Sequence, residues 1–112
     1  MPGADPHIPY ARFRAALEAC DLAFILRNAE RLTFGLADAV EVCLLICAQA
    51  PERLEPAGLR WVRRYAAEAN RQQWGDYRLI VDAFEALPSD PDPAVDRLLS
   101  LCAARGLGRA GS

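Results

Sequence analysis

Apolar residues recur every three or four positions along nearly the whole chain, and this spacing restricts the fold more than any other feature. Side chains at that spacing lie on one face of an α-helix. No stretch alternates apolar and polar residues in the way that a half-buried strand does. Hydrophobic residues make up 53% of the 112 positions, which is too many for a disordered chain. The sequence therefore predicts one compact all-α domain.

The apolar pattern divides into six short helices with brief connections. We expect them over residues 10–20, 21–32, 36–50, 56–69, 77–87 and 93–105. The first two have apolar stripes that are out of phase, so we place a break at Asp21, whose carboxylate would cap the second helix. Asp76 and Asp92 are the expected N-caps of the last two helices. Asn70 and Gly106 are the expected left-handed caps at the ends of the fourth and sixth helices.

The third predicted helix is the expected centre of the bundle. It is apolar on every side from Val42 to Ala48, so neighbouring helices must surround it. Proline and glycine gather near the two ends of the chain. We therefore expect a disordered tail over residues 1–9, the helical domain over 10–107 and a flexible C-terminus over 108–112.

The sequence contains no run of about 20 apolar residues, which is the length that a membrane-spanning helix needs. Its first residues also lack the basic stretch and apolar segment of a secretory signal. We therefore expect a cytoplasmic protein that makes no contact with membranes. Thiols stay reduced in that compartment, so disulfides are not expected.

The four cysteines, Cys20, Cys43, Cys47 and Cys102, include no C-x-x-C pair. Cys43 and Cys47 lie one helical turn apart in the apolar third helix, where free cysteine packs as a small hydrophobe. We therefore expect neither a metal nor a cofactor. A thiol metal or redox site, completed by Cys20, Cys102 or His7, is the third functional alternative, although the spacing matches no standard zinc pattern.

Residues that could perform catalysis are few. His7 is the single histidine and lies in the proline-rich N-terminal segment. No serine or threonine stands in a nucleophile motif, and no glycine-rich loop could hold a phosphate. Asp38 and Glu41 are one turn apart, and we expect them to form the solvated edge of the third helix. The sequence therefore predicts a protein that is not an enzyme.

The fourth predicted helix combines aromatic and arginine side chains, the residue types that contribute most to protein interfaces. Trp61, Arg64 and Tyr65 lie close together on it, and Trp74 and Phe24 are further candidates for the same surface. We therefore predict a small adaptor or regulator that binds a protein partner through this face. A homodimer formed through the same face is a variant of that hypothesis.

Arginines on the same helix support a second hypothesis. Arg60, Arg64 and Arg71 share one side of the helical wheel if the helix continues that far, and Arg63 borders them. Such a stripe could hold a nucleic-acid backbone. The net charge of −2 argues against this, and pairing with neighbouring acids is the simpler interpretation.

Four segments carry a resemblance to other sequences. They are Asp21-Leu22-Ala23-Phe24-Ile25-Leu26, Leu36-Ala37-Asp38-Ala39, Leu59-Arg60-Trp61-Val62-Arg63-Arg64-Tyr65 and Cys102-Ala103-Ala104-Arg105-Gly106-Leu107. From residue 21 to residue 107 the chain resembles short helical proteins of high-GC bacteria. The use of arginine without any lysine is typical of such genomes. The resemblance implies a helical fold and no particular activity.

Overall fold

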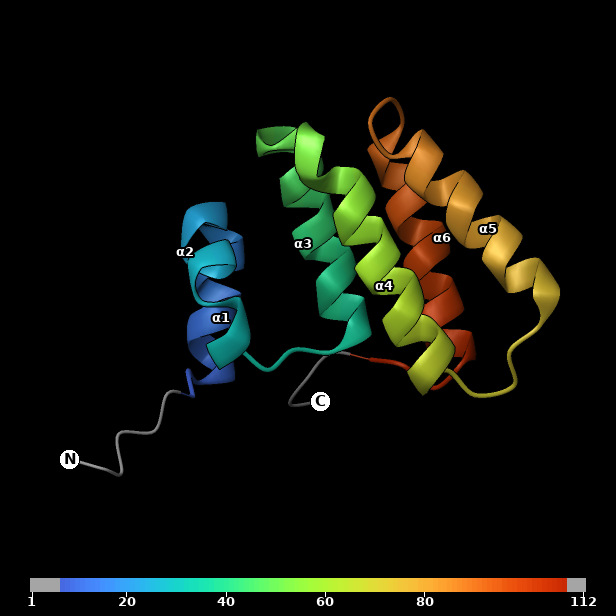
Figure 1. Cartoon of the computed structure of the whole chain (residues 1–112), viewed down its shortest axis with the longest axis horizontal. Coiled ribbons are helices and arrows are strands. Elements are labelled where there is room, and N and C mark those ends of the chain that lie inside the picture. Colours follow the sequence, from blue (N-terminus) through green and yellow to red (C-terminus); the bar gives the residue numbers. More distant parts are fainter. Residues whose placement is uncertain (1–6, 109–112) are drawn as a thin grey trace.

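The computed structural model describes residues 7–108, and within them the fold is all-α (Figure 1). Six α-helices and two 3₁₀ turns follow one another along the chain. The α-helices are α1 (Tyr10–Glu18), α2 (Leu22–Arg27), α3 (Leu36–Gln49), α4 (Leu54–Glu68), α5 (Trp74–Ala86) and α6 (Pro91–Ala104). The 3₁₀ turns are Ala29–Arg31 and Pro51–Arg53. The predicted fold class is therefore confirmed. None of the helices in the described residues is long and apolar enough to cross a membrane.

Helix α3 lies at the centre of the bundle, as predicted. It packs against α2, α4 and α6, and α5 packs against α4 and α6 (Figure 1). Exposed side chains appear only at its C-terminal end. Seven of its side chains are buried: Leu36, Ala37, Asp38, Val40, Val42, Cys43 and Ile46. An apolar helix in the middle of a bundle is what the run of hydrophobic residues demands.

The break between α1 and α2 falls where the out-of-phase stripes predict it. Cys20 has a positive φ of 57°, which ends α1 and turns the chain. The Asp21 carboxylate then accepts the backbone N–H of Phe24 at 3.1 Å, so it caps α2. Helix α2 is shorter than predicted, because the Asn28 side chain donates to the Phe24 carbonyl at 2.9 Å and a 3₁₀ turn follows.

Helix α4 also differs from its predicted boundaries. Helix α4 begins at Leu54 and ends at Glu68, and the positive φ after it belongs to Arg71, not to Asn70. The backbone N–H of Asn70 instead donates to the Arg105 carbonyl at 3.0 Å, which ties the end of α4 to the end of α6.

The starts of α5 and α6 also differ from the prediction: α5 begins three residues earlier than predicted and α6 two residues earlier. Asp76 and Asp92 lie inside the first turn of their helices and do not occupy the N-cap positions. An acidic side chain is favourable in either place, because both lie beside the unpaired N–H groups of a helix start. The end of α6 is as predicted: Gly106 has a φ of 76°, and the Leu107 N–H donates to the Cys102 carbonyl at 2.8 Å.

The segment before α1 contributes to the core, which contradicts the predicted tail over residues 1–9. Ile8 is buried, and its N–H donates to the Arg31 carbonyl at 2.8 Å beside Leu32. At the other end, the Gly108 carbonyl accepts the Ala37 N–H at 3.3 Å. The rest of the two predicted flexible ends, residues 1–6 and 109–112, lies outside the described residues.

Candidate functional site

The aromatic residues of α4 face the core, so the predicted outward face is wrong for Trp61 and Tyr65. Their exposed fractions are 2% and 0%. Together with Ala57 they recur every four residues, which places them on one side of the helix. The indole N–H of Trp61 donates to the Leu36 carbonyl at 3.1 Å. Because these large rings bury the most apolar area and their polar atoms find partners inside, burial is their stable arrangement.

The other predicted partner-binding residues do not gather on one surface. Trp74, at the start of α5, is 91% exposed. Phe24 on α2 is half-buried, with the Arg12 guanidinium 4.8 Å above its ring. Figure 1 shows α2 and α5 at opposite ends of the bundle. Arg64 is half-buried and forms an ion pair with Glu68 at 2.9 Å. The five residues therefore do not form the single face that the sequence suggests.

The predicted arginine stripe is also interrupted. Arg60 and Arg63 are exposed on α4, and Arg60 and Arg64 line the same cavity. Arg64 donates to the Glu68 carboxylate, which agrees with the simpler interpretation that neighbouring acids pair with these arginines. Arg71 lies beyond the end of α4 at Glu68, so the helical wheel does not reach it. A continuous strip of four arginines on one helix is therefore absent from the described residues.

The cysteines are dispersed through the fold. Cys43 and Cys102 are buried, Cys47 is half-buried and Cys20 is exposed. Burial raises the pKa of the Cys43 thiol to about 12 and that of Cys102 to about 11. Both therefore stay neutral at physiological pH and pack as apolar groups. Among residues 7–108, no group of three or more histidine, cysteine and acidic side chains is placed to hold a metal ion.

Asp38 is fully buried at the start of α3, so the predicted solvated edge is wrong for this residue. Its carboxylate accepts the Tyr10 hydroxyl at 2.8 Å and the Arg14 guanidinium at 3.2 Å. It also accepts the backbone N–H of Gly35, the residue before the helix, at 2.9 Å. The half-buried Glu41 pairs with the same Arg14 at 2.9 Å. These contacts fasten α1 to the beginning of α3.

Asp76 repeats this arrangement at the start of α5. It accepts the Tyr65 hydroxyl at 2.6 Å, two Arg105 N–H groups at 2.8 Å each and the Gln73 backbone N–H at 3.0 Å. The Arg105 hydrogen bonds hold the pKa of the Asp76 carboxyl well below its usual range. Burial, followed by the contact with Asp76, raises the pKa of Tyr65 to about 12. This network connects α4, α5 and the end of α6.

Both aspartates are fully hydrogen-bonded, and no buried side-chain nitrogen or oxygen in the described part of the chain lacks a partner. Their carboxylates contact side chains from outside their own helices: Tyr10 and Arg14 for Asp38, and Tyr65 and Arg105 for Asp76. The networks therefore hold helices together. Sequence reasoning missed both, although an acid three residues after Gly35 and after Gln73 has the spacing of a capping box.

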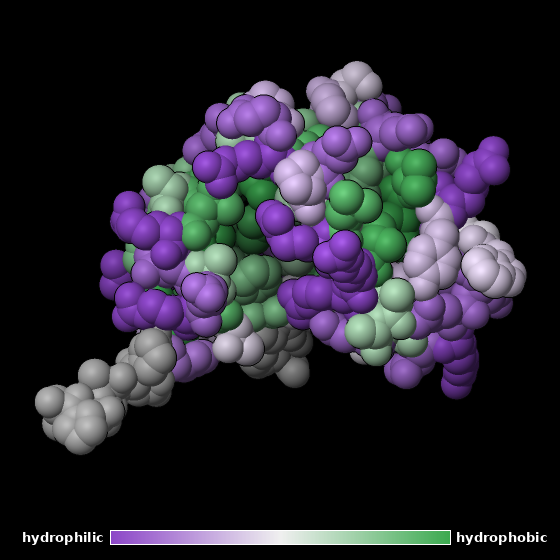
Figure 2. Space-filling model, viewed as in Figure 1, coloured by the Kyte–Doolittle hydropathy of each residue, from purple (hydrophilic) through white to green (hydrophobic). Residues whose placement is uncertain are grey.

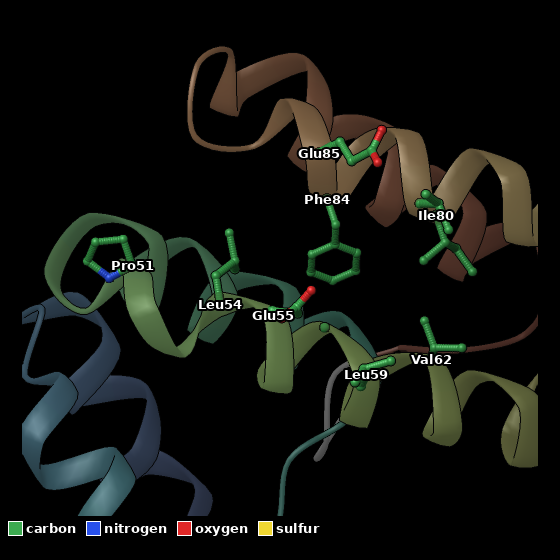
Figure 3. A pocket seen from close by; sticks show the side chains of 10 residues that line it. Pro51, Leu54, Glu55, Leu59, Val62, Ile80, Phe84 and Glu85 are labelled. Atoms are coloured by element: carbon green, nitrogen blue, oxygen red, sulfur yellow. The ribbon is translucent and has the colours of Figure 1, made fainter.

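An apolar groove of about 420 Å³ lies between α4 and α5. Figure 3 shows the Phe84 ring pointing from α5 toward α4, where it packs over Gly58. Leu59 of α4 and Val81 of α5 border the groove with exposed fractions of 59% and 51%. The other apolar lining residues are Pro51, Leu54, Val62 and Ile80. Helix α4 therefore exposes aliphatic side chains in this groove, although its aromatic face is buried.

Two acidic side chains complete the groove. Glu55 comes from α4 and Glu85 from α5, and both are exposed (Figure 3). Neither makes a hydrogen bond or an ion pair with another residue in the range 7–108. Sequence reasoning missed this site because a groove depends on the distance between two helices, which periodicity does not contain. No protein-family model, no curated protein and no solved structure matches this chain.

Proposed function

We propose that this chain is a protein-interaction domain whose docking surface is the groove between α4 and α5. The observation that carries the proposal is the pair of exposed aliphatic side chains, Leu59 and Val81, beside an apolar hollow. Apolar grooves with polar rims are typical docking sites, since leaving such surface in water is unfavourable. The hydrogen-bonded state of both buried aspartates supports a binding function rather than a catalytic one.

The chemistry of the groove fits an amphipathic helix with basic residues. A helix presents apolar side chains at i, i+3, i+4 and i+7, which suits a groove between two neighbouring helices. Glu55 and Glu85 place two negative charges without partners at its edge. Lysine or arginine on the incoming helix would neutralise them. Trp74 lies on the same helix as Val81 and stays a candidate for contact with a longer partner.

The test uses a labelled model peptide with leucine at those four spacings and lysine elsewhere, followed by fluorescence anisotropy. The double variant Leu59→Asn/Val81→Asn removes apolar surface at two exposed positions, so the fold is expected to persist. We expect at least about tenfold weaker binding, which corresponds to about 1.4 kcal/mol. Ala15→Asn, at an exposed alanine of α1 away from the groove, is the matched control and is expected to bind as the wild type does.

The charge on the rim is tested separately. Glu85→Gln is expected to weaken binding of the lysine peptide, and a peptide with glutamate in place of lysine is expected to bind poorly. Equal affinity for the two peptides, or equal loss in the groove variant and in Ala15→Asn, would contradict the proposal. Sedimentation of the chain alone shows whether a second copy fills the groove: a dimer that the double variant dissociates would make this chain its own partner.

A further inference from the structure

A second cavity, of about 210 Å³, lies between α2, α3 and α4, on the side of α4 away from α5. Figure 2 shows two hydrophobic areas on this face of the molecule, with hydrophilic side chains between them. The walls of the cavity are almost entirely apolar and include Ile25, Leu26, Phe34, Val42, Ile46 and Trp61. The cavity is therefore a separate site from the groove. Its lining residues come from α2, α3, α4 and the segment before α3.

The charged groups of this cavity are both arginines. Arg60 and Arg64 of α4 line it, one helical turn apart, and no carboxylate is among the lining residues. Arg64 is partly neutralised, since it pairs with Glu68 and donates to the Phe34 carbonyl at 3.1 Å. Arg60 is exposed and makes no hydrogen bond or ion pair with another described residue. An apolar cavity therefore has one uncompensated guanidinium at its edge.

Cys43 also lines the cavity, and its chemistry restricts what the site can do. The thiol is buried, and its pKa is raised to about 12, although the positive charge of Arg60 acts to lower it. At neutral pH the sulfur is therefore a protonated, weakly polar part of the wall. A group that enters the cavity is therefore expected to contact the sulfur without forming a covalent bond to it.

We propose that this cavity binds a small carboxylate with an aliphatic or aromatic body. The body would fill the apolar interior, and the carboxylate would lie at the edge, where the Arg60 guanidinium can donate to it as a fork. Size supports the choice, since a cavity of about 150 Å³ lined by apolar side chains holds benzene. A cavity of about 210 Å³ accordingly suits a medium-length acyl chain or a phenyl ring with a short side chain.

Octanoate is the probe, and 1-octanol and acetate are its controls for charge and for apolar body. Binding is followed by titration of backbone amide signals in NMR spectra, below the concentration at which octanoate forms micelles. We expect saturable 1:1 binding of octanoate, with shifts centred on residues around Val42 and Trp61, and no localised shifts with acetate. Arg60→Gln is expected to weaken octanoate binding about fivefold, since an ion pair at an exposed arginine is lost, and to leave octanol binding unchanged.

Two further variants keep the result interpretable. Arg63→Gln removes an exposed arginine from the same helix outside the cavity, and it is expected to bind octanoate as the wild type does. Ala29→Leu places a larger side chain at an exposed lining position, so it should block both octanoate and octanol while thermal unfolding stays unchanged. Absence of saturable binding, shifts spread over the surface, or equal effects of Arg60→Gln and Arg63→Gln would each overturn the proposal.

Discussion

Trp61 and Trp74 show how much the surroundings of one residue type decide its role. The ring of Trp61 packs between Tyr65 and Phe84, at centroid distances of 5.7 and 5.8 Å. The ring of Trp74 stands in solvent at the first turn of α5. Tryptophan is apolar over most of its surface and polar at one atom, so it suits a core and an interface alike. For that reason its identity alone did not predict which of the two indoles is buried.

Stability measurements separate the two tryptophans. Trp61→Ala should lower the free energy of unfolding by about 3–5 kcal/mol, because it leaves a large cavity and removes the hydrogen bond from the indole to the Leu36 carbonyl. Trp74→Ala should change it by less than about 0.5 kcal/mol, as exposed substitutions usually do. Urea unfolding followed by circular dichroism measures both. Losses of similar size would show that the two side chains have similar surroundings.

The Asp76 network makes stability depend on pH. Its carboxyl has a pKa below the ordinary 3.8 in the folded chain, so its contribution is present above about pH 4 and decreases as the pH falls further. Asp76→Asn should cost about 2 kcal/mol at neutral pH and flatten the acid-side dependence. Asp82→Asn, at an exposed side chain, is the control that should retain the wild-type dependence. If the free energy of unfolding depended on pH equally in both variants, the acid sensitivity would come from groups other than Asp76.

The alkaline side gives a separate expectation. Tyr65 has a pKa raised from 10 to about 12, so its neutral form is favoured in the folded state. The contribution of Tyr65 should therefore be full below pH 10 and decrease as the pH rises from there toward about 12, and the buried thiols of Cys43 and Cys102 should add a decrease that begins near pH 9. Tyr65→Phe should remove the part of this dependence that belongs to the phenol and leave the part that belongs to the thiols, which unfolding at several alkaline pH values would show. A wild-type curve that is flat over this range would contradict the burial of the phenol.

Thiol reactivity provides a third test at the residue scale. Among the four cysteines only Cys20 is exposed, Cys47 is half-buried, and Cys43 and Cys102 are buried with raised pKa values. A colourimetric thiol reagent should therefore modify one thiol rapidly, and Cys20→Ser should remove that fast phase. The buried thiols should react only when the chain unfolds. Rapid reaction of Cys43 in the folded protein would show that the wall of the second cavity is open.

At the scale of helices, the sequence predicts where elements exist better than where they begin. Asp21 caps α2 as expected, whereas Asp76 lies in the first turn of α5. Both places give an acidic side chain access to unpaired N–H groups, so local spacing does not distinguish them. Asp76 lies in the first turn of α5 because it contacts Tyr65 and Arg105 there, two residues from outside α5.

Two glycines test the helix ends. Gly106 has a positive φ, and a Cβ atom there would lie 2.7 Å from the Asn70 side-chain nitrogen. Gly106→Ala should therefore lower stability by about 1 kcal/mol or more. Gly75 lies in the first turn of α5 with open space around it, so Gly75→Ala should be neutral or stabilising. Thermal unfolding compares them, and equal effects would contradict the left-handed cap after α6.

For the whole molecule, periodicity predicted the fold class and the central position of α3, because both depend on which faces of helices are apolar. It did not predict the sites. The Asp76–Arg105 contact joins residues 29 positions apart, and the groove depends on the spacing of α4 and α5. Burial of Trp61 likewise depends on the rotation of α4 against α3. These are relations between elements, and no local pattern within one helix contains them.

Both proposed sites depend on how α4 is rotated about its own axis. This rotation turns the Trp61 indole inward and leaves the groove on one side of α4 and the second cavity on the other. Acrylamide quenching of Trp74→Phe measures it directly, since Trp61 is then the single tryptophan. The folded variant should resist quenching and emit at short wavelength, whereas the same chain in urea should be quenched freely. Quenching in the folded state as strong as that in urea would place the Trp61 indole at the surface and contradict the account.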